Sequence, residues 1–97
     1  MKRVRFHPAA MAEFEAAFDW YLDRSPAAAA EFAAEMTRAI ARIARAPLLF
    51  AEGQCRTRRY NFHHFPYSVV YLDDPSMVQI VAVMHSRRRP EYWKTRL

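Results

Sequence analysis

The hydrophobic positions in the first part of the chain change from a strand pattern to a helical one. The opening "KRVRF" alternates charged residues with Val4 and Phe6, which predicts a strand over 2–6. From Pro8 onward, apolar residues recur every three or four positions, which predicts an amphipathic helix over 8–23. We expect Pro8 to occupy the first helical position, where its missing N–H costs nothing.

A second helix is predicted over 26–45. Ser25 is a good helix-capping residue, Pro26 suits the first turn, and apolar side chains then return at helical spacing in an alanine-rich background. Pro47 ends this pattern. Because so few residues separate the two helices, we expect them to pack antiparallel as a hairpin.

Beyond Gly53 the period of the apolar residues becomes two, which predicts strands over 55–62, 66–72 and 77–85, followed by a tail over 86–97. The connections are short and rich in turn residues, so the three strands should form an antiparallel meander. The glycine is the only one in the chain, and we expect it to supply a positive φ just before the sheet.

The predicted fold is α+β. A single domain over 1–97 would carry an antiparallel helical hairpin on one face of a small, mainly antiparallel sheet. The stretches "YSVVYL" and "MVQIVAVM" are apolar on both sides, which is typical of a sheet covered on both faces. One hairpin covers one face, so we expect part of the second face to be open to a partner. The alternative is that the loop over 48–50 and the tail cover it.

Charge is distributed unevenly along the chain. Residues 1–53 hold seven Lys or Arg and seven Asp or Glu, whereas residues 54–97 hold eight and three, so the net charge of +5 comes from the second part. Such asymmetry indicates an anionic partner, either nucleic acid or an acidic protein segment. The single Cys55 forms no internal disulfide, and neither a signal peptide nor a membrane span is apparent. We therefore expect a cytoplasmic protein that does not enter membranes.

Metal and cofactor chemistry find little support in the sequence. His63 and His64 are adjacent, so on an extended chain their side chains point apart, and no cysteine pair accompanies them. A glycine-rich phosphate loop cannot be built from one glycine. We expect neither a metal nor a cofactor.

The tail "MHSRRRPEYWKTRL" concentrates cations and aromatic rings after the last predicted strand. Guanidinium groups bind phosphates and carboxylates in a forked geometry, and aromatic rings stack on bases. The residues expected to contact a target or a nucleic acid are Arg87, Arg88, Arg89 and Trp93.

A metal-independent ribonuclease is a second interpretation of the same region. Such an enzyme needs a base for the ribose 2′-OH, cations for the phosphorane charge and an acid for the leaving oxygen. The side chains available for these roles are Arg59, His85, Arg87 and Tyr92. The sequence alone does not bring them together.

The stretches "FHPAAMAEFEAAFDWYLDRSPAAAAEFAAEM", "RRYNFHHFPYSVVYLDD" and "VQIVAVMHSRRRPEYW" together resemble the RelE/ParE superfamily of bacterial toxins. This resemblance implies a β-α-α-β-β-β fold and a toxin of a type II toxin–antitoxin system, also known as a plasmid stabilisation protein. It further implies an antitoxin partner that wraps the toxin. On the predicted open sheet face, the residues expected to bind the antitoxin are Tyr67, Val69, Tyr71, Val81 and Val83.

The superfamily divides by activity. RelE-like members are ribosome-dependent mRNA endoribonucleases, and ParE-like members inhibit DNA gyrase by binding. The RelE-type pattern would place its strand cations near Thr57 and Arg59 and an arginine at Ser68, whereas Arg87 matches its arginine after the last strand. Because a cation at Ser68 would stabilise phosphorane charge, its loss favours a ParE-like gyrase inhibitor. The alternatives are a RelE-like endoribonuclease and a non-toxic nucleic-acid-binding or scaffold module.

Overall fold

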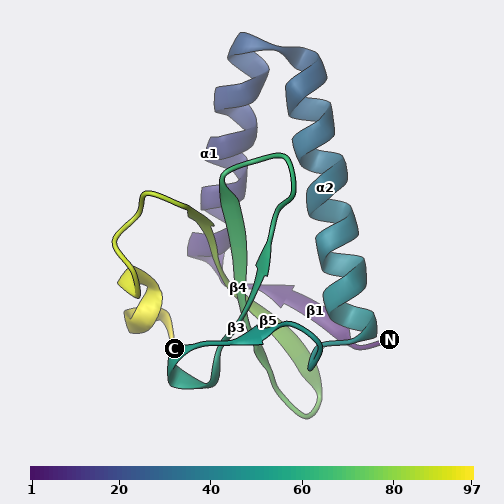
Figure 1. Cartoon of the computed structure of the whole chain (residues 1–97), viewed down its shortest axis with the longest axis vertical. Helices are drawn as coiled ribbons and strands as arrows, with labels where there is room; N and C mark the ends of the chain where they lie inside the picture. Colours follow the sequence, from purple (N-terminus) through teal and green to yellow (C-terminus); the bar gives the residue numbers. More distant parts are fainter.

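Two helices pack against one face of a five-stranded sheet in this computed structural model, which describes residues 1–97 (Figure 1). The elements, in chain order, are β1 (Arg3–Phe6), α1 (Pro8–Arg24), α2 (Pro26–Arg45), β2 (Ala51–Glu52), the 3-10 segment η1 (Gln54–Arg56), β3 (Arg58–Asn61), β4 (Tyr67–Asp73), β5 (Met77–His85) and the 3-10 segment η2 (Tyr92–Arg96). The strand order is β1-β5-β4-β3-β2, with β1 parallel to β5 and the other neighbours antiparallel. The predicted α+β fold is confirmed.

Local capping explains where both helices begin. The Nδ1 atom of His7 accepts a hydrogen bond from the Ala9 amide at 3.0 Å, and Pro8 follows at the first helical position. The Ser25 hydroxyl accepts from the Ala28 amide at 3.2 Å, so the same residue ends α1 and caps α2. Neither helix is long and apolar enough to cross a membrane.

Phe32 of α2 is the centre of the main core, which lies between the helices and the sheet. Its side chain is fully buried, and five aromatic rings lie with their centroids 5.2–5.6 Å from its own. These rings belong to Phe14, Tyr21, Phe62, Phe65 and Tyr67. Aromatic contacts of this kind fix the hairpin over β4 and the turn before it.

The strand predicted over 55–62 is wrong at its beginning. Cys55 and Arg56 have φ values of 57° and 62°, so the chain turns through a left-handed region, and the paired strand begins only at Arg58. Before this turn, the short strand β2 pairs with β3 at the edge of the sheet. Because non-glycine residues seldom adopt positive φ, a strand-like alternating sequence without glycine does not predict such a turn.

Gly53 does not have the positive φ that we expect from the sequence. Its φ is −122°, and a Cβ atom placed there would meet the Thr57 hydroxyl at an ordinary 3.6 Å. The turn is instead held by hydrogen bonds from the Gly53 amide to the Thr57 carbonyl at 2.7 Å and from the Thr57 hydroxyl to the Gln54 carbonyl at 2.6 Å.

A β-bulge in β5 changes which side chains share a face. Val70 of β4 pairs with Ala82, but the next residue pairs with Ile80, so Val81 has no partner. The bulge reverses the alternation that follows it. Val83 therefore joins the core beneath the helices, whereas Val81 packs on the opposite face. The expectation that these two valines share a face is wrong.

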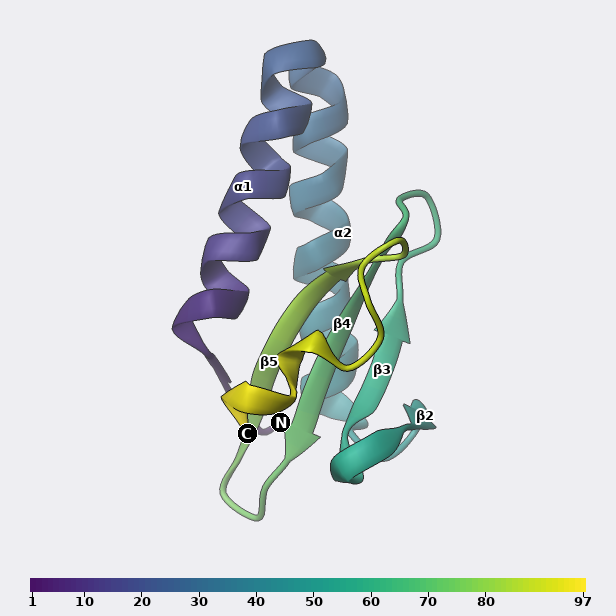
Figure 2. The same ribbon diagram turned by 90° about the vertical axis from the view of Figure 1, so that its left-hand side faces the viewer.

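The C-terminal tail covers the sheet face that we expect to be open. Figure 2 shows the tail, in yellow, crossing the sheet on the side away from α2. Trp93 of η2 is 2% exposed and packs against a second, smaller apolar cluster. The sheet residues of this cluster, each 0–5% exposed, are Val70, Val81, Ala82 and Met84. The alternative that the tail covers this face is therefore the one the structure adopts.

Candidate functional site

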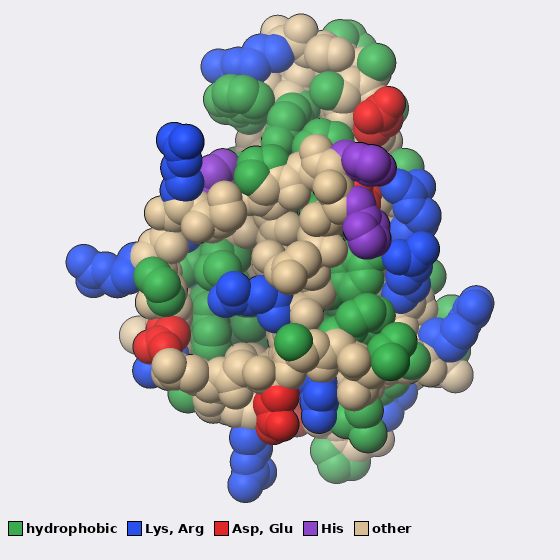
Figure 3. Space-filling model, in the orientation of Figure 1, with side chains coloured by type: hydrophobic (Ala, Val, Ile, Leu, Met, Phe, Trp, Pro, Cys, Tyr) green, Lys and Arg blue, Asp and Glu red, His purple; other side chains and the backbone are tan.

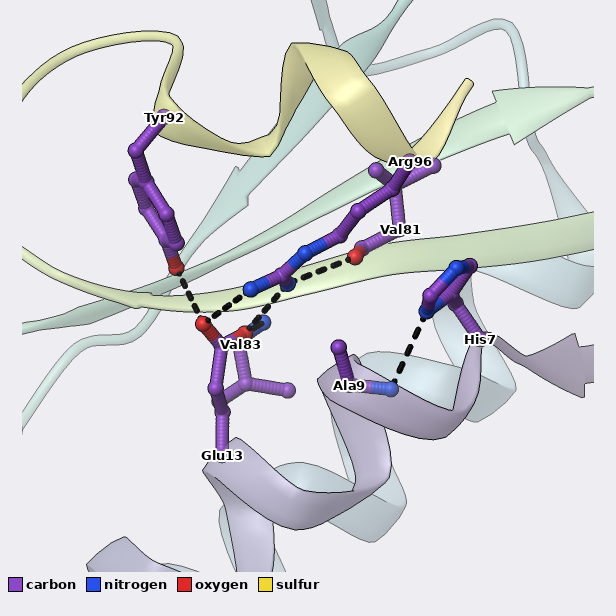
Figure 4. Close-up of polar contacts among 7 residues, drawn as sticks. All are labelled: His7, Ala9, Glu13, Val81, Val83, Tyr92 and Arg96. Atoms are coloured by element: carbon purple, nitrogen blue, oxygen red, sulfur yellow. Dashed lines mark hydrogen bonds and ion pairs between the residues drawn. The ribbon is translucent and has the colours of Figure 1, made fainter.

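Tyr92 and Arg96 of η2 fasten the tail to Glu13 of α1, and we call these three residues the tail clamp (Figure 4). Both guanidinium NH₂ groups of Arg96 donate to the Glu13 carboxylate, each at 2.9 Å. The Tyr92 hydroxyl donates to the same carboxylate at 2.7 Å. Forked guanidinium–carboxylate pairs are strong and directional, so this arrangement fixes where the tail crosses the sheet.

The tail clamp also closes an exposed sheet edge. β1 ends at Phe6, which pairs with Ile80, and β5 continues beyond that point without a neighbour on this side. The Val83 amide donates to Glu13 Oε1 at 3.0 Å, and the Val81 carbonyl accepts from Arg96 at 3.1 Å. Side chains thus satisfy backbone groups that a further strand would otherwise pair.

The tail clamp holds Glu13 ionised and Tyr92 neutral. Burial would raise the pKa of Glu13, but hydrogen bonds from Arg96, Tyr92 and the Val83 amide outweigh it and lower that pKa. Burial, together with the hydrogen bond to the carboxylate, raises the pKa of Tyr92 well above its usual range. A tyrosine in this state is a hydrogen-bond donor and is poorly suited to give up its proton.

These pKa shifts predict how stability depends on pH. The lowered pKa of Glu13 stabilises the fold above the unfolded-chain value of 4.5, and this contribution is lost as pH falls through the lower folded value. The raised pKa of Tyr92 stabilises the fold below pH 10.0, and this contribution is lost at higher pH. We expect the urea concentration at the unfolding midpoint to decrease as the pH is lowered below about 4.5. Glu13→Gln should make this decrease smaller. An equally steep acid decline in the variant would contradict this assignment.

An aromatic groove of about 500 Å³ lies between α1, the ends of β4 and β5, and the loop that leads into the tail. Trp20, Tyr21, Tyr67 and His85 line it, and Arg88 stands at the loop side. Trp20 is 52% exposed. The Arg24 guanidinium lies 3.7 Å from the centre of the Trp20 ring, which restricts the indole while leaving one side open. Such a surface suits a partner with apolar side chains.

A second concavity, which we call the tail cleft, lies where the tail returns to the start of β3. It encloses about 340 Å³, and Arg58, Arg59, Pro90, Glu91 and Trp93 are among its lining residues. The tail cleft is more polar than the aromatic groove, because only three of its eleven lining residues are hydrophobic. No group of three or more His, Cys, Asp or Glu side chains is placed to hold a metal ion.

The four residues considered for a ribonuclease do not meet in one site. Arg59 pairs with Val70, which faces the tail, whereas His85 pairs with Tyr67, whose ring packs on α2. Because directly opposed residues share a face, Arg59 and His85 lie on opposite faces of the sheet. Tyr92 is held in the tail clamp. Arg87 is exposed in the loop, and its backbone amide donates to His85 Nδ1 at 3.0 Å.

The residues expected to contact a target fall into two groups, the arginines of the exposed loop and the buried Trp93. Arg87 and Arg89 are exposed and form no ion pair. Arg88 lies 3.8 Å from the centre of the Tyr92 ring. Trp93 is buried, so it is inaccessible to a target while the tail is in place. Figure 3 shows Lys and Arg side chains projecting on the left side, where the tail loop runs in Figure 1.

The residues expected to bind an antitoxin are mostly inside the folded chain. Val69, Tyr71 and Val83 are 0–2% exposed in the core beneath the helices, and Val81 is 1% exposed beneath the tail. Burial raises the pKa of Tyr71 to about 12, and its hydroxyl donates to the Pro47 carbonyl. Tyr67 is half-buried and lines the aromatic groove. It is the one residue of this set that a partner can reach without unfolding part of the domain.

Sequence reasoning missed Glu13 and Arg96, which organise the tail. Glu13 is one of several acids on the polar side of the predicted first helix, and Arg96 is one of several cations near the C-terminus. Their separation of 83 residues leaves no local spacing pattern. One feature of the predicted topology could have indicated this pair. The first helix and the tail both lie next to the last strand, so an acidic residue of the helix could meet a cation of the tail.

The fold and its clasped tail define a small α+β protein whose surfaces suit binding. The family model described as "ParE toxin of type II toxin-antitoxin system, parDE" matches residues 4–90. The chain belongs to this ParE toxin family of type II toxin–antitoxin systems. No curated protein matches it.

A solved structure described as "Chromosomal ParDE TA system from P. aeruginosa" is similar to this chain. The TM-score is 0.74 and the sequence identity 16%, and the match covers 88% of this chain and 96% of that chain. At this level of identity the likeness shows the fold alone. The predicted RelE/ParE resemblance, with its preference for the ParE branch, is confirmed by the family match.

Proposed function

We propose that this toxin acts by binding DNA gyrase and inhibiting it, and that a cognate antitoxin neutralises it. The observation that supports binding over catalysis is the separation of Arg59 from His85 on opposite faces of the sheet. A general base and the phosphate-binding cations must lie within reach of one phosphodiester, and this arrangement keeps Arg59 away from His85.

The surroundings of Ser68 also favour binding. In the RelE-type pattern an arginine would stand at this position, where it could stabilise the charge of a phosphorane. Here position 68 carries no cation, and the Ser68 hydroxyl donates to the Asn61 side chain at 2.7 Å. Tyr92, the candidate acid, keeps its proton because of burial and its bond to Glu13.

We further propose that the exposed loop arginines contact the target. Arg87 and Arg89 are free of ion pairs, so their charges are available to an acidic surface. For the antitoxin, Tyr67 and the aromatic groove supply an accessible apolar surface, whereas the other four predicted contacts are buried. The toxin is expected to work in the cytoplasm, where gyrase acts.

Supercoiling of relaxed plasmid DNA by purified gyrase should be inhibited by the protein, and its antitoxin should restore the activity. The double variant Arg87→Glu, Arg89→Glu should inhibit about tenfold less, because it reverses charge at the contact. The matched control is Arg3→Glu, Arg5→Glu, two exposed positions on β1, which should inhibit like the unchanged protein.

Two results would contradict the proposal. The first is unimpaired gyrase together with new mRNA cuts in a translating extract, which would favour the endoribonuclease. The second is normal growth of bacteria that express the chain without an antitoxin, which would favour a non-toxic binding module. Equal losses in the β1 and loop variants would show that the loop arginines have no special role.

A further inference from the structure

Three arginines form a row on the exposed side of α2, and we call Arg38, Arg42 and Arg45 the α2 arginine row. They are spaced four and three residues apart, so they lie next to one another along the helix surface. All three are exposed, and none of them forms an ion pair. Figure 3 shows Lys and Arg side chains gathered on the right side, where α2 runs in Figure 1.

The α2 arginine row lies beside β3 and the turn that follows this strand. Arg42 donates a hydrogen bond to the Tyr60 hydroxyl at 3.0 Å. Arg38 and His64 line the same shallow concavity of about 230 Å³. These contacts place the row on one continuous surface of α2 and β3, on the helix side of the sheet and away from the tail.

Two carboxylates lie near the beginning of the row, and neither pairs with it. Glu35 is 2% exposed, and its carboxylate accepts a hydrogen bond from the His63 amide. Glu31 is exposed and lines the concavity with Arg38, but the two form no ion pair. Like charges at this spacing repel one another. The helix dipole favours cations in the last turn only, which does not include Arg38.

The surroundings of the row favour a polyanion over a protein surface as the partner. Protein interfaces are centred on aromatic and apolar anchors, and α2 exposes no large apolar side chain. Proteins bind single-stranded nucleic acids by stacking the bases on aromatic rings, and the aromatic residues of α2 and β3, Phe32 and Tyr60, are both buried. A duplex is different, because its charged backbone lies on the outside and needs neither kind of contact.

The length of the row also matches a duplex. At 1.5 Å per residue it spans about 10 Å along the helix, and one strand of a DNA duplex carries about three phosphates over that length. We propose that the α2 arginine row binds the phosphate backbone of duplex DNA, with each guanidinium donating to a phosphate. This inference does not depend on which enzyme the toxin inhibits, and its test contains no enzyme.

The salt dependence of binding reports the number of phosphate contacts. Fluorescence anisotropy of a short labelled DNA duplex, titrated with the full chain, should give a Kd of about 1–100 µM near physiological salt. Each phosphate contact contributes about 0.9 to the slope of log Kd against log salt concentration. Arg38→Gln with Arg45→Gln should therefore lower this slope by about 1.8, and it leaves the hydrogen bond between Arg42 and Tyr60 in place. Lysine at the same two positions should keep most of the slope, because the charges remain.

Arg3→Gln with Arg5→Gln is the matched control, because it removes the same net charge from two exposed positions. Val4 and Phe6 pack against the core beneath the helices, so the arginines that alternate with them lie on the opposite face of the sheet. The control should keep the slope of the unchanged protein.

Several results would overturn the proposal. An equal loss of slope in the control would show that only net charge matters, and an unchanged slope in the Arg38 and Arg45 variant would remove the row from the contact. Tighter binding of poly-L-glutamate or of a single strand than of the duplex would exclude duplex DNA as the preferred partner. The absence of duplex binding at low salt would exclude the site altogether.

Discussion

Replacing Trp93 with alanine is expected to lower the free energy of unfolding by about 3–5 kcal/mol. The indole is 2% exposed and packs on the sheet face away from the helices. Its removal leaves a cavity and exposes apolar side chains such as Val70 and Val81. The loss should be visible as a lower urea unfolding midpoint.

Trp20→Ala is the matched control, because it removes the same side chain from an exposed position. Trp20 is 52% exposed and mainly loses its contact with Arg24, so we expect a cost of about 1 kcal/mol or less. Similar losses in the two variants would show that the tail does not contribute to the core. An unchanged midpoint in Trp93→Ala would mean that the tail unfolds separately from the rest of the domain.

Glu13→Gln is expected to cost about 2–3 kcal/mol, the second largest effect. The change leaves the Arg96 guanidinium, whose side chain is 15% exposed, without its counter-charge. It also weakens the acceptor for the Tyr92 hydroxyl and the Val83 amide. Losing one partner of a largely buried ion pair is costly, because the remaining charge stays desolvated.

Glu15→Gln provides the control for Glu13→Gln. Glu15 is exposed on the same helix and has no ion-pair partner, so its replacement should change the midpoint little. Hydrogen exchange should locate the effect of Glu13→Gln at β5 and η2. Faster exchange spread evenly over the two helices would contradict a local role in holding the tail.

Local patterns were sufficient for the helical hairpin. Pro8, Ser25 and Pro26 each carry a steric or hydrogen-bonding preference that acts within a few residues, and the structure starts both helices accordingly. The alternation in the second half likewise predicted the strands that became β4 and β5. These features need no knowledge of distant residues.

Features that depend on an irregular backbone were not predictable in this way. Cys55 and Arg56 adopt positive φ although the sequence around them alternates like a strand. The bulge at Val81 has no marker such as a glycine, yet it decides on which face Val83 lies. Cys55 and Arg56 lie outside the paired strands, and the bulge interrupts the pairing of β4 with β5. Neither feature follows from the local preference for a strand, which is weak to begin with.

The candidate site shows the same division. The sequence located the cations and aromatic rings of the tail and showed the family resemblance. It also indicated a binding protein with an anionic partner. It could not show that Trp93 is an anchor, that Tyr92 is a bound donor, or that Arg59 and His85 lie on opposite faces. Each of these depends on how the tail folds back over the sheet.

By itself, the sequence determined the order of elements, the helical hairpin, the meander and the excess of positive charge in the second half, because short-range spacing and residue type encode all of these. Only the tertiary structure decided that the tail covers the second sheet face and that Glu13 and Arg96 clasp it across 83 residues. The physical reason is that such a contact depends on the packing of elements remote in the chain. Its free energy becomes available only once β5 and α1 have already brought the partners together.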